Sequence, residues 1–295
     1  MKNKIVAIGS IAIDEIQTIK GSKSDLVGGS ATYFSVASSK YNDVKLIGVV
    51  GEDFPQKGWD LFESTGVSID FISVEKGSTF RWGGKYSEDY SKRETLYTHL
   101  GVFENFSPII SESVSTDYLY LGNIHPALQL ETIKKIDNKK RIVSDTMNLW
   151  IDLDPDGVWK VVEKSDIFFL NDEEAFELTN GKDLYDIGRK FISHGPDIVV
   201  IKKGAKGSLL FTSDKVLEVP VFDKIDLLDP TGAGDSFAGG FIGYMSKFGE
   251  KNLEEALVHA TAMASYTVSG FGVEGLLSYS KNSFESRLNY IKSKI

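Results

Sequence analysis

Short apolar runs rich in β-branched residues alternate with helical patterns along most of the chain. The first run, from Lys4 to Ile13, is typical of a buried strand, and Asp14 closes it. Further strands are predicted within 44–50, 118–123, 141–148, 166–175 and 197–211. Helical patterns occupy 128–136 and 253–269, so strands and helices alternate through the second half. That alternation is typical of a parallel sheet with crossover helices.

Residues 71–100 have a different pattern. The segments 79–86 and 94–100 are aromatic and β-branched, and they flank a polar, charged connection from Ser87 to Arg93. This arrangement predicts a β-hairpin with a longer loop. The sequence contains no internal repeat, low-complexity segment or linker. We therefore expect one main domain.

The strongest chemical signal is the stretch 228–241, a glycine turn that leads directly into a helix. Gly232 and Gly234 permit backbone angles and close approaches that a Cβ would forbid. Apolar residues recur at helical spacing over 237–245, so a helix is expected to start at or just before Asp235. Because a helix start favours phosphate or developing negative charge, the turn is a candidate anion site. Asp235 is then either a base within that site or an ordinary N-cap.

Composition narrows the classes of ligand. The chain has 295 residues, which is enough for one large α/β domain or two small domains, and its 41% hydrophobic and 25% charged residues are ordinary for a globular protein. The net charge of -9 argues against a dedicated binder of nucleic acid or of anionic membranes. The absence of cysteine excludes disulfides and thiolate metal sites. The first apolar run is broken at Ser10 and Asp14, unlike a signal peptide, and no run reaches transmembrane length, so we expect a cytoplasmic protein.

Taken whole, the stretch 228–241 resembles the C-terminal signature of the ribokinase-like (PfkB) carbohydrate kinases. The resemblance implies an α/β, three-layer fold with a mainly parallel central sheet flanked by helices, plus a small β lid. It implies a single kinase domain over residues 1–295, with lid strands inserted at about 14–26 and 71–100. It also assigns Asp235 as the base that accepts the proton of the acceptor hydroxyl. The anion hole for the transferred phosphoryl group is assigned to Gly232, Ala233 and Gly234.

The N-terminal third carries the expected acceptor site. Ligands gather at the carboxyl ends of strands in α/β sheets, and the family places a substrate-binding aspartate where Asp14 stands; an exposed loop aspartate is the alternative. Gly28–Gly29 match the family's N-terminal glycine pair beside the sugar. Tyr33 stands where many members have an asparagine, so the acceptor pocket is expected to differ. Arg81, on the predicted hairpin, is a candidate substrate contact, whereas Asp53 is expected to be structural, with a substrate contact as the alternative.

The second half carries the expected nucleotide site. Asn171 and Glu174 follow a buried strand and match the family's N-x-x-E motif, which organises magnesium and phosphate, so Glu174 is expected to act on Mg²⁺ indirectly. Acidic residues in a first helical turn also suit the helix dipole without any ligand. For Lys202 the alternative is a solvated lysine on a turn. The resemblance assigns nucleotide binding to Asn171, Lys202, Gly204, Gly207 and Thr231.

The sequence therefore predicts an ATP- and Mg²⁺-dependent kinase that phosphorylates a hydroxyl of a small sugar-like substrate. A nucleoside kinase of the adenosine type is the alternative within the same chemistry, since Tyr33 and Trp82 can stack on a base or pack on a sugar ring. A non-catalytic sugar or nucleotide sensor is the alternative of a different class. The resemblance is also compatible with a monovalent cation and with a homodimer through the lid. Neither nucleic acid nor a membrane is an expected partner.

Overall fold

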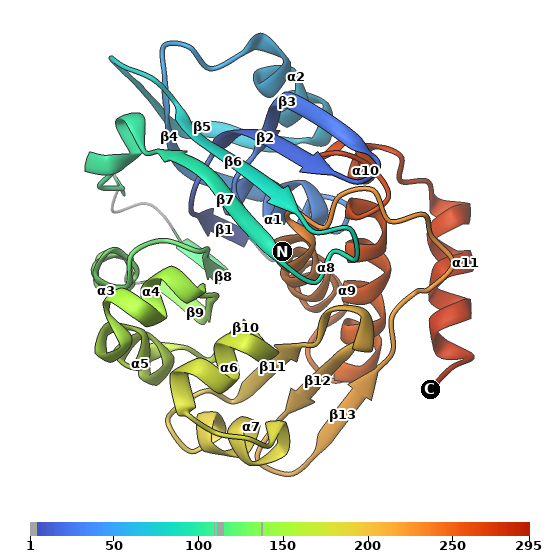
Figure 1. Cartoon of the computed structure of the whole chain (residues 1–295). Coiled ribbons are helices and arrows are strands. Elements are labelled where there is room, and N and C mark those ends of the chain that lie inside the picture. The colour runs from blue at the N-terminus through green and yellow to red at the C-terminus, as the bar shows by residue number, and fades with distance from the viewer. Residues whose placement is uncertain (1–4, 109, 111–114, 137) are drawn as a thin grey trace.

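The computed structural model of the protein describes residues 5–108, 110, 115–136 and 138–295. Within these ranges the strands form a nine-stranded sheet and a separate four-stranded sheet (Figure 1). The large sheet has the order β13-β12-β11-β10-β9-β8-β1-β4-β5. Its strands are β1 (Ile5–Ile8), β4 (Val44–Gly51), β5 (Val67–Glu75), β8 (Ser115–Leu121), β9 (Asn138–Ser144), β10 (Ile167–Asn171), β11 (Ile198–Lys202), β12 (Ser208–Phe211) and β13 (Val216–Val219).

The large sheet is mainly parallel. From β5 through β11 all neighbouring strands pair in parallel, and only β12 and β13 add antiparallel pairs at one edge. Successive residues of β1 point to opposite faces: Ile5 and Ala7 pack with α8 and α9, whereas Val6 and Ile8 pack with α3. Burial on both faces is what makes these strands read as continuous apolar runs. The expected three-layer α/β fold is confirmed.

Helices cover both faces of the large sheet (Figure 1). In chain order, with two short 3₁₀ segments, they are α1 (Ser30–Ser38), α2 (Gln56–Thr65), η1 (Gly101–Asn105), α3 (Pro126–Lys135), α4 (Asn148–Leu153), α5 (Pro155–Lys164), α6 (Asp172–Thr179), α7 (Leu184–Ile192), η2 (Gly204–Lys206), α8 (Ala233–Phe248), α9 (Leu253–Thr267), α10 (Glu274–Leu277) and α11 (Lys281–Lys292). In the described part of the chain, none of them combines the length and the apolar character needed to cross a membrane.

The small sheet combines two hairpins that are distant in sequence. It consists of β2 (Ala12–Thr18), β3 (Gly21–Gly28), β6 (Phe80–Tyr86) and β7 (Arg93–His99), in the order β3-β2-β6-β7. Each hairpin is antiparallel, and the parallel pair of β2 with β6 joins the two. The hairpin predicted around residues 87–93 is thus present.

Two predicted boundaries in this region are wrong. The single strand expected from Lys4 to Ile13 divides, because the chain leaves the large sheet after Ile8 and enters the small sheet at Ala12; Lys4 itself lies outside the described residues. Asp14 therefore lies inside β2. The lid strands expected at 71–100 begin too early, since residues 71–75 belong to β5, which pairs with β4 in the large sheet.

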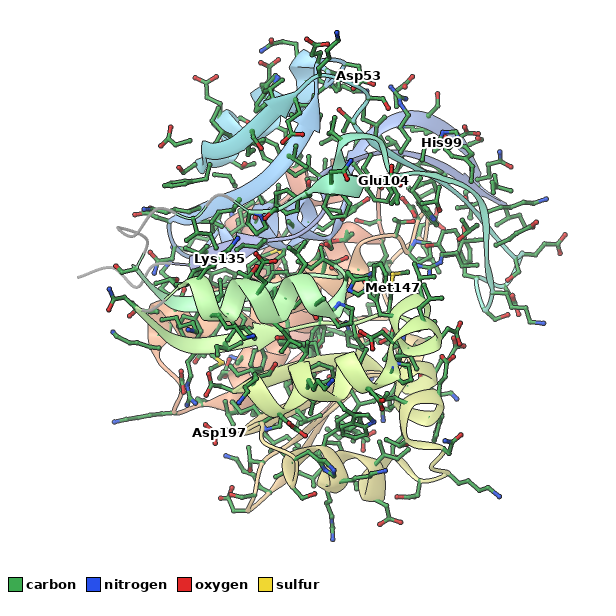
Figure 2. The ribbon with its side chains drawn as sticks, turned by 90° about the vertical axis from the view of Figure 1, so that its left-hand side faces the viewer. Asp53, His99, Glu104, Lys135, Met147 and Asp197 are labelled. Carbon is green, nitrogen blue, oxygen red and sulfur yellow. The ribbon has the colours of Figure 1, made fainter. Side chains whose placement is uncertain are left out.

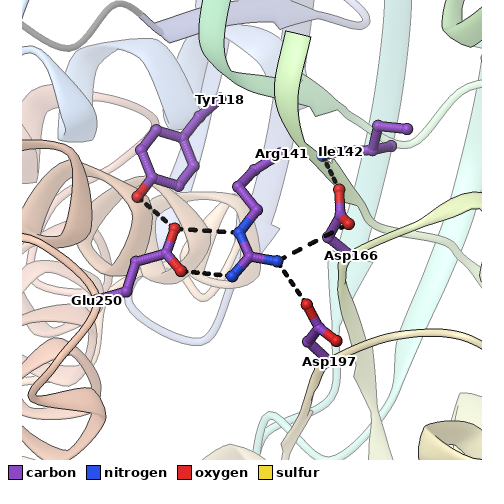
Figure 3. A network of polar contacts seen from close by, with 6 residues as sticks. All are labelled: Tyr118, Arg141, Ile142, Asp166, Asp197 and Glu250. Atoms are coloured by element: carbon purple, nitrogen blue, oxygen red, sulfur yellow. Dashed lines mark hydrogen bonds and ion pairs between the residues drawn. The ribbon is translucent and has the colours of Figure 1, made fainter.

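A polar network holds the N-terminal ends of the central strands together (Figure 3). Arg141 on β9 donates to Glu250 (Nη2 to Oε2, 2.6 Å) and to Asp197 (Nη1 to Oδ2, 2.5 Å). Glu250 also accepts from the Tyr118 hydroxyl of β8 at 2.7 Å. In Figure 2, Met147 and Asp197 mark opposite ends of the parallel strands, because Met147 follows β9 and Asp197 precedes β11. The network leaves the carboxyl ends, near Met147, available for a ligand site.

Candidate active site

A cavity of about 600 Å³ lies at the carboxyl ends of the parallel strands, where α/β sheets bind ligands. Asp145, Asn171 and Lys202 line it from the ends of β9, β10 and β11, respectively. The start of α8 forms another wall. The loop between β6 and β7 closes it from the side of the small sheet. The main polar lining residues are Arg93, Asp145, Asn171, Glu174, Lys202, Thr231 and Asp235.

The glycine turn before α8 has the geometry that requires glycine. Gly232 is the N-cap of α8 with φ +74°, and a Cβ there would overlap the ring of Tyr33. Since Gly232 occupies the N-cap position, Asp235 is not the cap and lies in the first turn instead. Tyr33 is 1% exposed and fills the space behind the turn. Its phenol therefore supports the turn from the core, and Tyr33 does not line the cavity.

The backbone N–H groups of Ala233 and Gly234 differ in whether they can donate to an anion in the cavity. The Ala233 N–H donates to the Pro230 carbonyl at 3.2 Å, and Ala233 does not line the cavity. Gly234 lines the cavity, and its N–H has no acceptor among the described residues. The N–H of Gly234, at the positive end of α8, is therefore a donor that an anion in the cavity can use.

Asp235 has the environment of a base that works near neutral pH. Its Oδ1 accepts a hydrogen bond from the Tyr120 hydroxyl at 3.2 Å. Burial and the charge of Asp145 raise the pKa of Asp235 to about 7, while the charge of Lys202 and the Tyr120 hydrogen bond act in the opposite direction. A carboxylate with such a pKa accepts a proton more readily than an ordinary aspartate and is still ionised at pH 7 in a large fraction of molecules.

Lys202 is not a solvated turn lysine. Its Nζ pairs with Oδ2 of Asp145 at 2.8 Å, and its side chain is only 16% exposed. Burial acts to lower the pKa of Lys202, but the charges of Asp145 and Glu174 outweigh it and raise the pKa. A Cβ on Gly234 would lie 3.1 Å from this Nζ, so the ammonium group stands directly beside the start of α8.

Asn171 and Glu174 form a reciprocal capping box at the start of α6. The Glu174 N–H donates to Oδ1 of Asn171 at 2.8 Å, and the Asn171 N–H donates to Oε2 of Glu174 at 2.7 Å. The N-x-x-E spacing therefore has a structural role that needs no ligand. Burial raises the pKa of Glu174 to about 8, partly offset by Lys202, and both residues still line the cavity.

The donor set suits a magnesium ion held mainly by phosphates. In the described part of the chain no group of three or more acidic or histidine side chains is placed to hold a metal directly. Mg²⁺ commonly keeps several waters and binds one or two carboxylates together with substrate phosphates. Glu174 and Asp145, which line the cavity, fit that indirect role. When bound, the ion would neutralise charge on the phosphate oxygens.

The remaining predicted nucleotide contacts divide into two groups. Gly204 (φ +54°) and Thr231 line the cavity. Gly207 (φ +86°) is buried and does not line the cavity. Its carbonyl accepts a hydrogen bond from the Lys203 N–H at 2.8 Å within the turn between β11 and β12. Gly207 shapes the turn that presents Gly204.

The acceptor side is built around Asp14, which is 4% exposed and is not a loop residue. Gly29 donates its N–H to this carboxylate, and a Cβ on Gly28 would overlap it. Burial, together with the charges of Asp229 and Asp235, raises the pKa of Asp14 to about 8. Three carboxylates therefore converge between the small sheet and the glycine turn. None of Asp14, Gly28 and Gly29 lines the cavity itself.

Arg81 lies away from this cavity. Its guanidinium pairs with Asp53 at 3.1 Å and with Asp25 at 3.5 Å. Asp53 also accepts from the backbone N–H (2.6 Å) and hydroxyl (2.8 Å) of Thr79. These contacts agree with the structural role expected for Asp53, and Arg81 is its partner.

Sequence reasoning missed two neighbours of the glycine turn, Tyr120 and Asp229. Tyr120 contacts Asp235 from β8, and only its place near the end of a buried strand offered a signal. Asp229 is fully buried and accepts from the N–H groups of Thr231 (2.8 Å) and Gly272 (2.9 Å). Asp229 thus fixes the glycine turn to the segment that follows α9, and its position within the signature was the only available clue.

Comparison with known proteins decides the family. The family model described as "pfkB family carbohydrate kinase" matches residues 2–278. The chain belongs to this family. It is accordingly a kinase, a phosphotransferase that acts on a hydroxyl group, and its relatives phosphorylate nucleosides or sugars.

Three relatives illustrate the likeness. The cytidine kinase of Thermococcus kodakarensis is 28% identical over 261 residues, which cover 82% of this chain and 88% of that protein. The crystal structure of Methanocaldococcus jannaschii nucleoside kinase superimposes with a TM-score of 0.80 at 22% identity, covering 98% of both chains. A putative ribokinase II from E. coli, solved with ATP and Mg²⁺, gives a TM-score of 0.80 at 19% identity and covers 98% of this chain and 99% of its own. The two structures confirm the ribokinase fold.

Proposed function

We propose that this pfkB kinase transfers the γ-phosphoryl group of ATP, with Mg²⁺, to a hydroxyl of a nucleoside. The proposal narrows the sugar-like acceptor expected from the sequence to the nucleoside alternative. The observation that carries it is the pairing of Asp14 with Trp82. These residues are direct partners in the parallel pair of β2 and β6, so their side chains share one face of the small sheet.

That face offers both a polar and an aromatic contact. Trp82 and Tyr86 are partly exposed and pack against the buried cluster of Ile16, Leu26 and Phe271. Neighbouring strands lie about 5 Å apart, a spacing similar to that between the hydroxyls of a ribose and its attached base. Asp14 is thus suited to accept hydrogen bonds from sugar hydroxyls while Trp82 stacks on the base. The relatives from Thermococcus and Methanocaldococcus, a cytidine kinase and a nucleoside kinase, support the same acceptor class.

The chemistry follows from the residues around the glycine turn. As the acceptor oxygen forms its bond to the γ-phosphorus, its proton passes to the carboxylate of Asp235, and the bond from phosphorus to the bridging oxygen of ADP breaks. The N–H of Gly234 and the ammonium of Lys202 stabilise charge on the phosphoryl oxygens. The small sheet acts as a lid that excludes water from the transfer. Asn171, Gly204 and Thr231 hold the nucleotide phosphates.

Three further properties belong to this proposal. The family resemblance makes a monovalent-cation requirement and a homodimer through the small sheet testable expectations. A cytoplasmic location is the third such expectation. The net charge of -9 gives no support to binding of nucleic acid or of an anionic membrane.

The test is a panel of acceptors with ADP release as the readout. Pyrimidine and purine nucleosides are compared with ribose, deoxyribose and fructose under identical ATP and Mg²⁺. Because base stacking contributes about 1–3 kcal/mol, we expect kcat/KM for the best nucleoside to exceed that for ribose by about 5- to 150-fold. A free sugar that is phosphorylated as well as every nucleoside would replace the proposal with a sugar kinase. Ligand binding without phosphorylation of any acceptor would favour a sensor.

A further inference from the structure

The loop between β6 and β7 reaches from the small sheet to the glycine turn. The Tyr86 hydroxyl lies 2.9 Å from Oγ1 of Thr231, and the Tyr90 hydroxyl donates to the carbonyls of Leu227 (3.2 Å) and Leu228 (3.3 Å). Two tyrosines thus attach the end of the small sheet to the segment that forms the anion site. The contacts bring the first residue of β7, Arg93, to the cavity wall.

The loop is internally braced. The Ser87 N–H donates to the Lys92 carbonyl at 2.9 Å, and the Lys92 N–H donates to the Ser87 hydroxyl at 2.9 Å. The Asp89 carboxylate accepts from the hydroxyls of Ser87 (2.7 Å) and Ser91 (2.8 Å). These bonds define the path of the chain into Arg93. The backbone at Arg93 is therefore positioned without help from a ligand.

Arg93 is a cation without a carboxylate partner. Its guanidinium lies 5.5 Å from the centre of the Trp82 ring, which supports the side chain from one side. Among the described residues it forms no salt bridge, whereas Arg81 and Arg141 are each paired with two or more carboxylates. Arg93 lines the same cavity as Glu174, and its charge acts to lower the pKa of that buried carboxyl. The guanidinium also hydrogen-bonds to the Tyr86 hydroxyl, and the rest of its five-donor fork can meet a ligand.

The charged residues that line the cavity favour a role for Arg93 in phosphate binding. Lys202 stands beside the start of α8 but is already paired with Asp145. Asp145, which also lines the cavity, is the partner of that ammonium, so part of the Lys202 charge is already compensated before a nucleotide phosphate binds. Arg93 faces the same cavity from the opposite sheet. A guanidinium binds phosphoryl oxygens through two parallel N–H bonds, which an ammonium group cannot do.

We propose that Arg93 is a catalytic residue that contacts the phosphoryl group during transfer, delivered to it by the small sheet. The inference rests on the proposed kinase activity and deepens it. Arg93 stabilises the charge on the equatorial oxygens while the acceptor bond forms, the proton moves to Asp235 and ADP leaves. Because Arg93 belongs to the small sheet, the transfer site is complete only when that sheet is docked on Thr231. Hydrolysis of ATP in the undocked protein is thereby suppressed.

The experiment compares Arg93→Gln, Arg93→Lys and the matched control Arg189→Gln, which removes an exposed arginine from α7. Turnover is measured with whichever acceptor of the panel reacts fastest, so the outcome does not depend on the acceptor being a nucleoside. A second readout is the affinity for Mg·ADP with and without aluminium fluoride, which mimics the phosphoryl group in transfer and needs no acceptor. Arg93→Lys gives an independent reading if the glutamine variant does not fold.

We expect Arg93→Gln to lower kcat by about 100-fold or more, the scale of losing one donor to the transition state. The acceptor KM and the affinity for ADP alone should change little, and aluminium fluoride should no longer tighten ADP binding. Arg93→Lys should recover only part of the loss, and Arg189→Gln should match the wild type. A kcat within about threefold of wild type, or an equal loss of ADP affinity with and without aluminium fluoride, would overturn the proposal.

Discussion

Replacing Tyr120 by phenylalanine should change the pH dependence of the kinase more than its maximal rate. The hydroxyl donates to Asp235 at 3.2 Å and helps to stabilise the ionised carboxylate. Tyr120→Phe removes that bond and preserves the stacking of the ring on Phe34, whose centre lies 3.6 Å away. The pKa of Asp235, about 7 in the intact protein, should therefore rise.

The size of the change follows from the bond. A hydrogen bond to a charged group contributes about 1.5–3 kcal/mol, and one pH unit corresponds to about 1.4 kcal/mol. Since 3.2 Å is long for a bond between a hydroxyl and a carboxylate, the lower end applies. We expect the acid limb of kcat/KM to move upward by about one pH unit. Below the limb the variant is then about tenfold slower, because the base is protonated, and above it the two enzymes are similar.

The assay is kcat/KM from about pH 5 to about pH 9, since this quantity reports the groups of the free enzyme. Asp145 and Lys202 also act on the pKa of Asp235, and both are unchanged in the variant. Tyr118→Phe is the matched control, because Tyr118 lies on the same strand and donates to the remote Glu250. It should lower stability and leave the limb in place. A uniform loss at every pH, or an unmoved limb in Tyr120→Phe, would refute the role given to Asp235.

Three other substitutions test the site from different sides. Asp235→Asn should lower kcat by at least about 100-fold, with ATP binding retained in calorimetry; near-normal turnover of the purified variant would exclude Asp235 as the base. Gly232→Ala should destabilise the fold by about 1–3 kcal/mol, seen in urea unfolding, because φ is +74° and the new methyl overlaps Tyr33; unchanged stability would contradict that geometry. The pKa of Asp14 is raised from its ordinary value of 3.8 to about 8, so ionisation of this carboxyl lowers the free energy of unfolding progressively between these two pH values. Asp14→Asn should therefore raise the Tm at alkaline pH but not below about pH 4, while acceptor binding is lost; an equal change in Tm at every pH would count against the cause given for the shift.

Local patterns predicted the large sheet well because its signals are local. The apolar runs of β1, β10 and β11 are buried on both faces, and the glycine turn before Asp235 needs only a few residues to define it. The N-x-x-E spacing was also readable, although its capping box explains it without a nucleotide. Features that depend only on residues close together in the sequence could therefore be predicted from it.

Contacts between distant segments were not available in the same way. That Tyr120 would meet Asp235 depends on the register of β8 and on the packing of α8, which no short pattern specifies. The parallel pairing of β2 with β6, which places Asp14 beside Trp82, joins hairpins that each look complete alone. In the sequence Arg93 is recognisable only as the end of a polar loop. Its approach to the cavity depends on hydrogen bonds from Tyr86 and Tyr90 to the segment 227–231, more than a hundred residues later.

The divided origin of the small sheet has a consequence for how the molecule assembles and opens. Its two hairpins are separated in sequence by β4 and β5, so their pairing depends on how the large sheet places residues 12–28 and 80–99. Contacts of such long sequence separation form late, and regions of low local stability open first. In hydrogen exchange the amides of the β2 and β6 pair should therefore exchange through local opening, well before those of β10 and β11. If the acceptor binds against the small sheet, as proposed, a bound acceptor should slow exchange there most.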